Sequence, residues 1–139
     1  MQNCEAEILS RPLITAEHLK RGAIIYLRRS TPEDAGSRAL HENQVQLARA
    51  YGWPRHLIEV IDDIGKGGFS VGDRSGWHRM SAEIVNNAIG IVFAASVSRL
   101  SRQVSAYKQL LSLAADHGTL LCIGNRIIDP SDRLRRDRQ

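Results

Sequence analysis

A sequence of 139 residues has the usual size of one domain and is long enough to bury one core. Its 42% hydrophobic and 24% charged residues disfavour a disordered chain, and a net charge of +4 favours a polyanionic partner, for which nucleic acid is one candidate. Two cysteines, Cys4 and Cys122, exclude the disulfide framework of a small secreted domain, and no apolar run is long enough to cross a bilayer. We therefore expect a cytoplasmic protein with no membrane partner.

The first predicted elements are a short helix and a strand. Residues 1–22 are mixed in character and form a lead-in segment, within which Thr15 caps a helix that runs through Leu19. Residues 23–27, AIIYL, are apolar and rich in β-forming side chains, and charged and turn-forming residues follow them. This pattern is typical of a central strand that is buried on both faces of a sheet.

The next part of the chain predicts a helix, a strand and a loop. Leu40, Gln44, Leu47 and Tyr51 recur at spacings of four, three and four, so they share one helical face, and one polar side chain points inward. Residues 57–62 predict the second strand. Four glycines then mark a loop, at positions 65, 67, 68 and 72.

The second half of the chain continues to alternate helices and strands. We expect a helix over residues 75–87, a strand over 89–95, a helix over 104–116 that Gly118 ends, and a strand over 119–123. Strands that alternate with helices across short loops predict the α/β class. The expected architecture is an open, mainly parallel sheet of four to five strands with helices on both faces.

Three segments that follow the predicted strands carry polar and charged side chains. They are residues 28–31, 62–72 and 98–102. The carboxyl ends of parallel strands meet at one edge of a sheet, and ligands bind at that edge. We therefore expect a hydroxyl group and several guanidinium groups to converge there.

A serine and three arginines in these segments suit attack on a phosphodiester. Ser30 directly follows a buried strand, and Arg28 points to the same side if the strand continues that far. A serine hydroxyl is a weak nucleophile at neutral pH, and its attack builds negative charge that arginines stabilise. Arg99 and Arg102 are three residues apart, so one helical turn can present both. Taken singly, a turn serine and a solvated arginine pair are the more common explanations of such motifs.

The two motifs together resemble those of a known family. YLRRST resembles the YxRxST signature of the serine recombinases, the resolvase and invertase group, and SRLSR resembles their DRLSR element in the same order and at a similar separation. The resemblance continues through the helix with Gln44, the strand that ends at Asp62, and GTLLCI. In detail the chain is similar to a large-recombinase branch that has STPE after the arginines, VID before the loop and SRL in place of DRL.

The resemblance implies an activity and a set of site residues. It implies a site-specific recombinase that cuts and rejoins double-stranded DNA through a covalent 5′-phosphoserine intermediate, with no cofactor and no metal. Ser30 is then the nucleophile, while three arginines bind and activate the phosphate, a fourth assists from the glycine loop, and a glutamine orders the pocket. These five supporting residues are Arg28, Arg99, Arg102, Arg74 and Gln44.

The resemblance also divides the chain. Residues 23–129 correspond to a resolvase-like catalytic domain, and residues 130–139 form a basic tail. Arg133, Arg135 and Arg136 of that tail are candidate DNA contacts, with a solvated, disordered end as the alternative. The family implies homodimers or tetramers that pair through a long helix, for which this sequence has no counterpart.

Two further hypotheses remain open because the chain departs from the family pattern. Ser98 replaces a common acid, Gly67 a common serine, Asp34 a frequent glutamine, and Gly90 an acid found in some members. The early end of the sequence and Gly67 favour a truncated, catalytically silent module that binds DNA or partner subunits, whereas the Ser98 change is shared by the similar branch and does not imply an inactive chain. A small phosphate-binding domain unrelated to DNA is a third hypothesis.

Other residue types give weaker signals. The five histidines are scattered, with no pair at metal-ligand spacing. Trp53 and Trp77 are candidates for stacking on bases, but tryptophans at the start of a connection or a helix are more often packing anchors, and we favour packing.

Overall fold

The computed structural model describes residues 13–29, 35–64, 75–101 and 103–132, and within them five strands form one sheet in the order β2-β1-β3-β4-β5. The strands are β1 (Gly22–Arg29), β2 (Ile58–Ile64), β3 (Ile89–Ala94), β4 (Leu120–Ile123) and β5 (Arg126–Ile128). The first four are parallel, and β5 pairs with β4 in the antiparallel direction. The predicted α/β class and mainly parallel sheet are confirmed.

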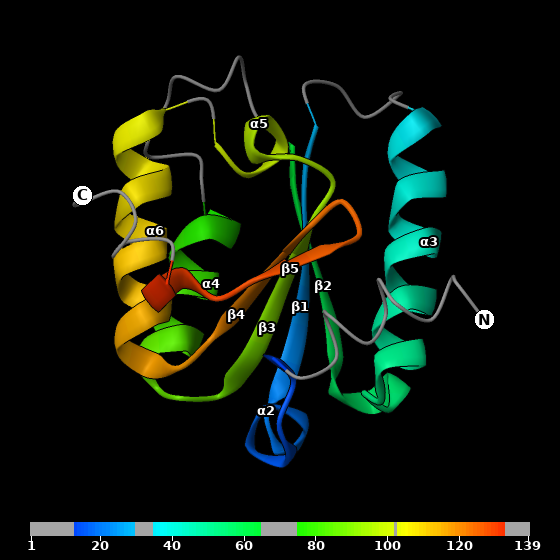
Figure 1. Cartoon of the computed structure of the whole chain (residues 1–139). Helices are drawn as coiled ribbons and strands as arrows, with labels where there is room; N and C mark the ends of the chain where they lie inside the picture. The colour runs from blue at the N-terminus through cyan, green and yellow to red at the C-terminus, as the bar shows by residue number, and fades with distance from the viewer. Residues whose placement is uncertain (1–12, 30–34, 65–74, 102, 133–139) are drawn as a thin grey trace.

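Helices cover both faces of the sheet, and two short helices lie at the opposite ends of its strands (Figure 1). The helix α3 (Ala35–Tyr51) covers one face, and α4 (Ser75–Val85) and α6 (Val104–His117) cover the other. We call the edge where β1 to β4 begin the amino edge and the edge where they end the carboxyl edge. The short helix α2 (Ala16–Lys20) lies at the amino edge, and α5 (Val97–Leu100) lies at the carboxyl edge. A single 3-10 turn, Arg55–Leu57, leads into β2.

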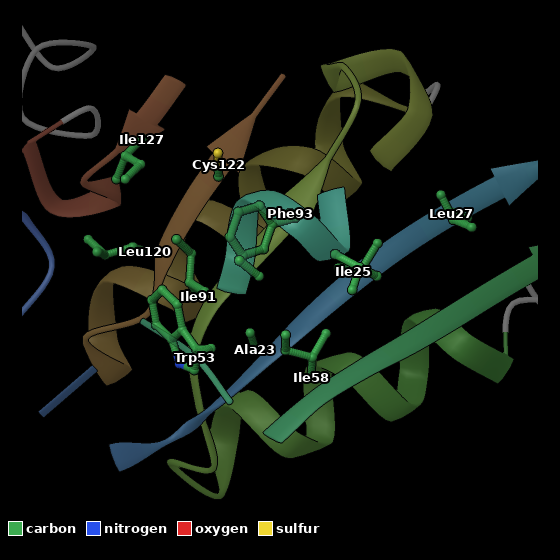
Figure 2. Close-up of a cluster of buried hydrophobic side chains, with 12 residues drawn as sticks. Ala23, Ile25, Leu27, Trp53, Ile58, Ile91, Phe93, Leu120, Cys122 and Ile127 are labelled. Atoms are coloured by element: carbon green, nitrogen blue, oxygen red, sulfur yellow. The ribbon is translucent and has the colours of Figure 1, made fainter. Parts of the chain in front are cut away.

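The central strand β1 supplies side chains to two separate cores. Ala23, Ile25 and Leu27 join the cluster on the α3 side, which also contains Trp53 and Phe93 (Figure 2). Ile24 and Tyr26 join the cluster on the other face, with side chains from α4 and α6. Successive side chains of a strand point to opposite faces, so a strand covered on both sides must be apolar throughout. This requirement explains the run that predicted β1.

Most predicted elements are present with slightly different ends. The strand expected over residues 23–27 extends to Arg29, because Arg28 and Arg29 pair with Asp63 and Ile64 of β2. The helix expected to reach residue 87 ends at Val85, shortly before Asn87 with its φ of 60°. Gly118 ends α6 in the left-handed conformation with a φ of 68°, as predicted.

One irregularity interrupts the pairing of β1 with β3. Gly22 pairs with Ile89 and Ala23 pairs with Ile91, so the register shifts at this point and Gly90 has no partner of its own. An extra residue of this kind is a β-bulge, which changes the local direction of the backbone. The bulge lies at the amino edge, opposite the end of the sheet where the sequence predicts the site.

Candidate active site at the carboxyl edge of the sheet

The end of β1 brings the first sequence motif to the carboxyl edge. Arg28 and Arg29 are the last two residues of this strand, and their pairing with β2 fixes the position of their backbone. Ser30 follows directly in the sequence, but it lies outside the described residues. Arg74 and Arg102 also lie outside them, as do the side chains of Arg28 and Arg99. The convergence of these side chains therefore stays a prediction.

The second motif lies on α5, which packs against β1. Figure 1 shows this one-turn helix above the end of β3, close to the end of β1. Leu100 is completely buried and belongs to the cluster that contains Tyr26 of β1. The backbone of Arg99 thus lies on a turn whose next residue is anchored in the core. The structure brings together the strand that carries Arg28 and the helix that carries Arg99.

Ser101 joins α5 to the following helix. Its side chain is buried, its backbone N–H donates to the carbonyl of Val97 at 3.0 Å, and its Oγ accepts from the backbone N–H of Gln103 at 3.0 Å. Gln103 is the N-cap of α6, and its own side chain makes no capping hydrogen bond. Sequence reasoning assigned no role to Ser101, although its place between two arginines of SRLSR was an available signal. A serine whose Oγ accepts from the N–H two residues later forms a local turn of this kind, here directly before α6.

Gln44 is the predicted site residue whose side chain the structure describes. It lies in α3 and is only 4% exposed, so the inward polar side chain expected on this helix is confirmed. Its neighbours Val45 and Ala48 pack in the cluster with Ile25 and Leu27 of β1. Gln44 Oε1 has no hydrogen-bond partner within the described parts of the chain. A buried oxygen left in this state costs about 1–3 kcal/mol, so a glutamine retained here calls for an explanation beyond packing.

The two tryptophans serve as packing anchors, as predicted. Trp53 is 1% exposed and meets the ring of Phe93 edge to face, with centroids 6.4 Å apart. Trp77, in the first turn of α4, meets Tyr26 of β1 in the same manner at 5.7 Å. Edge-to-face pairs of this kind add roughly 0.5–1.5 kcal/mol to the burial of the rings. The second pair ties the start of α4 to the central strand.

Groups with shifted pKa values offer no competing chemistry at the carboxyl edge. Burial raises the pKa of the Cys122 thiol to about 12, so this thiol stays protonated near neutral pH. Burial and the neighbouring Glu59 carboxylate raise the pKa of Glu83, while Arg79 pairs with both carboxylates. Glu59 is the second residue of β2, so this group of three lies towards the amino edge.

Two other kinds of site, a metal centre and a membrane span, have no counterpart among the described residues. Among these residues, no three His, Cys, Asp or Glu side chains come together as metal ligands would. None of the described helices has the length and hydropathy of a membrane span. The three tail arginines proposed to contact DNA, Arg133, Arg135 and Arg136, lie beyond the last described residue, Asp132.

Comparison with protein families gives one match that covers most of the chain. The model of the resolvase N-terminal domain matches residues 23–136. An uncharacterized protein, y4bA/y4pH of Sinorhizobium fredii (strain NBRC 101917 / NGR234), is 34% identical over 128 residues, which cover 85% of this chain and 18% of that protein. The chain therefore spans less than a fifth of the length of this relative.

Solved structures share the same fold. The N-terminal catalytic domain of TP901-1 integrase is 23% identical with a TM-score of 0.64, over 85% of this chain and 97% of that one. A resolvase family site-specific recombinase from Streptococcus pneumoniae is 22% identical with a TM-score of 0.63, over 85% and 88% of the two chains. A serine recombinase from Sulfolobus solfataricus is 26% identical with a TM-score of 0.54, over 84% and 76%.

Proposed function

We propose a function from one established premise, which is that this chain belongs to the resolvase family of serine recombinases. The chain is, in this proposal, the catalytic domain of a site-specific DNA recombinase. The observation that carries the proposal is the contact of α5 with the end of β1. This contact brings the strand that ends at Arg29 and the helix that carries Arg99 together at the edge where parallel sheets bind their ligands.

The proposed reaction is a transesterification at a DNA phosphate. The Ser30 Oγ attacks the phosphorus and gives up its proton, a new Oγ–P bond forms, and the bond from phosphorus to the 3′ oxygen breaks. The 3′ oxygen leaves with a proton as a hydroxyl group, and the 5′ phosphate stays esterified to Ser30. One ester replaces another, so the step needs no nucleotide and no redox partner. Attack by a 3′ hydroxyl from an exchanged strand reverses it.

Three arginines are proposed to stabilise the charge that this attack builds. Arg28 from β1, with Arg99 and Arg102 from the SRLSR motif, would donate to the equatorial phosphate oxygens. Guanidinium groups suit this task because they stay charged and donate in a planar fork. Removal of one such donor from a preorganised site typically lowers the rate about 10²–10³-fold.

Two further residues are proposed to support the same site. Arg74 would contact the phosphate from the glycine loop. Gln44 would order the pocket, and its buried Oε1, without a partner in the described parts, supports this role because it offers an acceptor to an incoming donor.

Double-stranded DNA is the proposed partner, and the cytoplasm is the proposed compartment. Arg133, Arg135 and Arg136 are proposed phosphate contacts, and the net charge of +4 agrees with a polyanionic ligand. Homodimers that pair as tetramers are proposed for strand exchange, since recombination must hold two DNA sites at once.

Detection of a covalent adduct tests the proposal. The full chain is incubated with supercoiled plasmids and with nicked duplexes. Together these substrates cover the DNA on both sides of the sequence that encodes the chain. The products are then denatured and digested. We expect mass spectrometry to find a 5′-phosphate on Ser30, and Ser30→Ala to remove the adduct completely. Ser112→Ala, a change at an exposed position of α6, is the matched control and should retain it.

Two results would overturn the proposed chemistry. One is an adduct that persists in Ser30→Ala or maps to another residue. The other is a wild-type chain that retards these duplexes in gels yet forms no adduct, which would favour the catalytically silent DNA-binding module instead.

A further inference from the structure

A segment that precedes the family match packs against the sheet. The family model begins at residue 23, whereas the described chain begins at residue 13 and includes α2 at the amino edge (Figure 1). Leu13, Ile14 and Leu19 pack against the same core cluster as Trp53. We call residues 13–22 the N-terminal clamp.

Gly90 lets the clamp approach the sheet. A Cβ atom at this position would overlap the carbonyl oxygen of His18 and lie 2.9 Å from the Cα of His18, so only glycine fits while the clamp is docked. Gly90 is also the extra residue in the register of β1 and β3. The glycine that departs from the family pattern therefore lies directly beneath α2.

Two hydrogen bonds tie the clamp to distant parts of the chain. The Arg21 guanidinium donates to the carbonyl of His117, at the end of α6, at 2.8 Å. The Trp53 indole Nε1–H donates to the carbonyl of Arg21 at 3.0 Å. Trp53 is 1% exposed, so its ring is a buried reporter of whether the clamp is in place.

The His18 imidazole is a structural part of the clamp. Its Nδ1 accepts from the backbone N–H of Thr15 at 2.9 Å and lies 3.0 Å from the Thr15 Oγ1. The His18 backbone N–H donates in return to Thr15 Oγ1 at 3.4 Å, which completes a capping box at the start of α2. A nitrogen that accepts from an N–H carries no proton, so this arrangement requires the neutral tautomer with the proton on Nε2.

We propose that the N-terminal clamp is an acid-sensitive latch, closed while His18 is neutral and released when His18 is protonated. A proton on Nδ1 places a donor against the Thr15 N–H, so the capping box opens. Release of α2 then moves the Arg21 carbonyl away from the indole N–H of Trp53, which loses its acceptor.

The charges around the ring support this direction. Burial is the main cause that lowers the pKa of His18 below its ordinary value of 6.5, and the Arg21 guanidinium also lowers it. The backbone of Gly118 and the Asp129 carboxylate beyond β5 act in the opposite sense and raise this pKa. On α2 itself, Glu17 and Lys20 pair with each other at 3.5 Å and are largely exposed. Since the folded state binds this proton less tightly than the unfolded state, the stabilisation is fully present above pH 6.5 and is lost as the pH falls through the lowered value.

Two-dimensional ¹H–¹⁵N NMR of the full chain tests the latch. The indole signal of Trp53 is followed from pH 7.5 to pH 5 together with the ring signal of His18. We expect the two to change with one midpoint, below 6.5, in the wild type. His18→Gln keeps an acceptor for the Thr15 N–H but does not titrate, so its Trp53 signal should stay constant. His78→Gln, at an exposed position of α4, should behave as the wild type does.

Thermal unfolding gives a second measurement. Between pH 7.5 and pH 5.5, the melting temperature of the wild type should fall roughly 2–4 °C more than that of His18→Gln. Gly90→Ala should shift the Trp53 indole signal already at pH 7.5, towards its acid position in the wild type. The inference is wrong if His18 titrates at or above 6.5, if His18→Gln keeps the wild-type pH dependence, or if Gly90→Ala leaves the indole signal in place.

Discussion

At the amino edge of the sheet, side chains from separate segments bond to one another's backbones, whereas at the carboxyl edge Leu100 of α5 is buried in the cluster that contains Tyr26, and Ser101 Oγ accepts from the N–H of Gln103. The amino edge has the bonds of Arg21 to His117, of Trp53 to Arg21, and of Thr119 Oγ1 to the carbonyl of Ile89 at 2.9 Å. The amino edge is thus held by side-chain hydrogen bonds between separate segments. The opposite edge positions the residues proposed for chemistry, as is common in parallel α/β sheets.

The largest expected effect is the loss of activity in Arg99→Ala. We expect adduct formation at Ser30 to slow about 10²–10³-fold, because one donor to the developing phosphate charge is removed. The midpoint of urea unfolding should stay within error, since the next residue, Leu100, anchors α5 in the core. Arg49→Ala, at an exposed position of α3, is the control and should change neither quantity. A large loss of stability in Arg99→Ala would break the division between the two edges.

A smaller effect is expected from Trp53→Phe at the amino edge. This change removes the indole donor to the Arg21 carbonyl and leaves a gap beside Phe93, so the free energy of unfolding should fall by about 1–3 kcal/mol. Urea unfolding followed by circular dichroism measures the fall. The rate of adduct formation per folded molecule should stay within about twofold, as a change remote from the proposed site should give. A fall of more than about twofold in the rate of adduct formation per folded molecule would show that the two edges are coupled.

The smallest expected effect comes from Gln44→Met, which tests the buried glutamine beside β1. The buried Oε1 without a described partner opposes folding, so a side chain of similar shape and no such oxygen should raise the free energy of unfolding by about 1 kcal/mol. Adduct formation should slow at the same time if Gln44 orders the pocket. Gln46→Met, the same change at an exposed position of α3, is the matched control and should alter neither quantity. A gain in stability with no loss of rate would assign Gln44 to packing alone.

The sequence predicted those parts of the fold whose cause is local. β1 and β3 are buried on both faces and are therefore largely apolar, and α3 shows its buried face in the spacing of Gln44, Leu47 and Tyr51. β5 is three residues long, with Arg126 exposed, and forms only because β4 pairs with it. The extension of β1 to Arg29 likewise depends on the ladder with β2. Such pairing leaves little signal in a short window of sequence.

The candidate site was predictable to a similar degree. The order of YLRRST and SRLSR, each after an apolar run, was sufficient to place both motifs at one edge of a parallel sheet. The packing of α5 on β1 depends on contacts between elements, so the motifs alone did not reveal it, whereas the bond between Ser101 Oγ and the Gln103 N–H is local. The meeting of Arg28, Arg99 and Arg102 around Ser30 remains a prediction, since those side chains lie outside the described residues.

The bulge at Gly90 has a consequence for how this domain varies among its relatives. Gly90 leaves room for the backbone of α2, and the register shift is confined to the start of β3, so the pairing of β1 with β2 and of β3 with β4 continues undisturbed towards the other end of the sheet. A helix before the first strand and a glycine at this position should accordingly be gained and lost together. Relatives that carry a side chain there should either start at the first strand or direct their leading residues elsewhere.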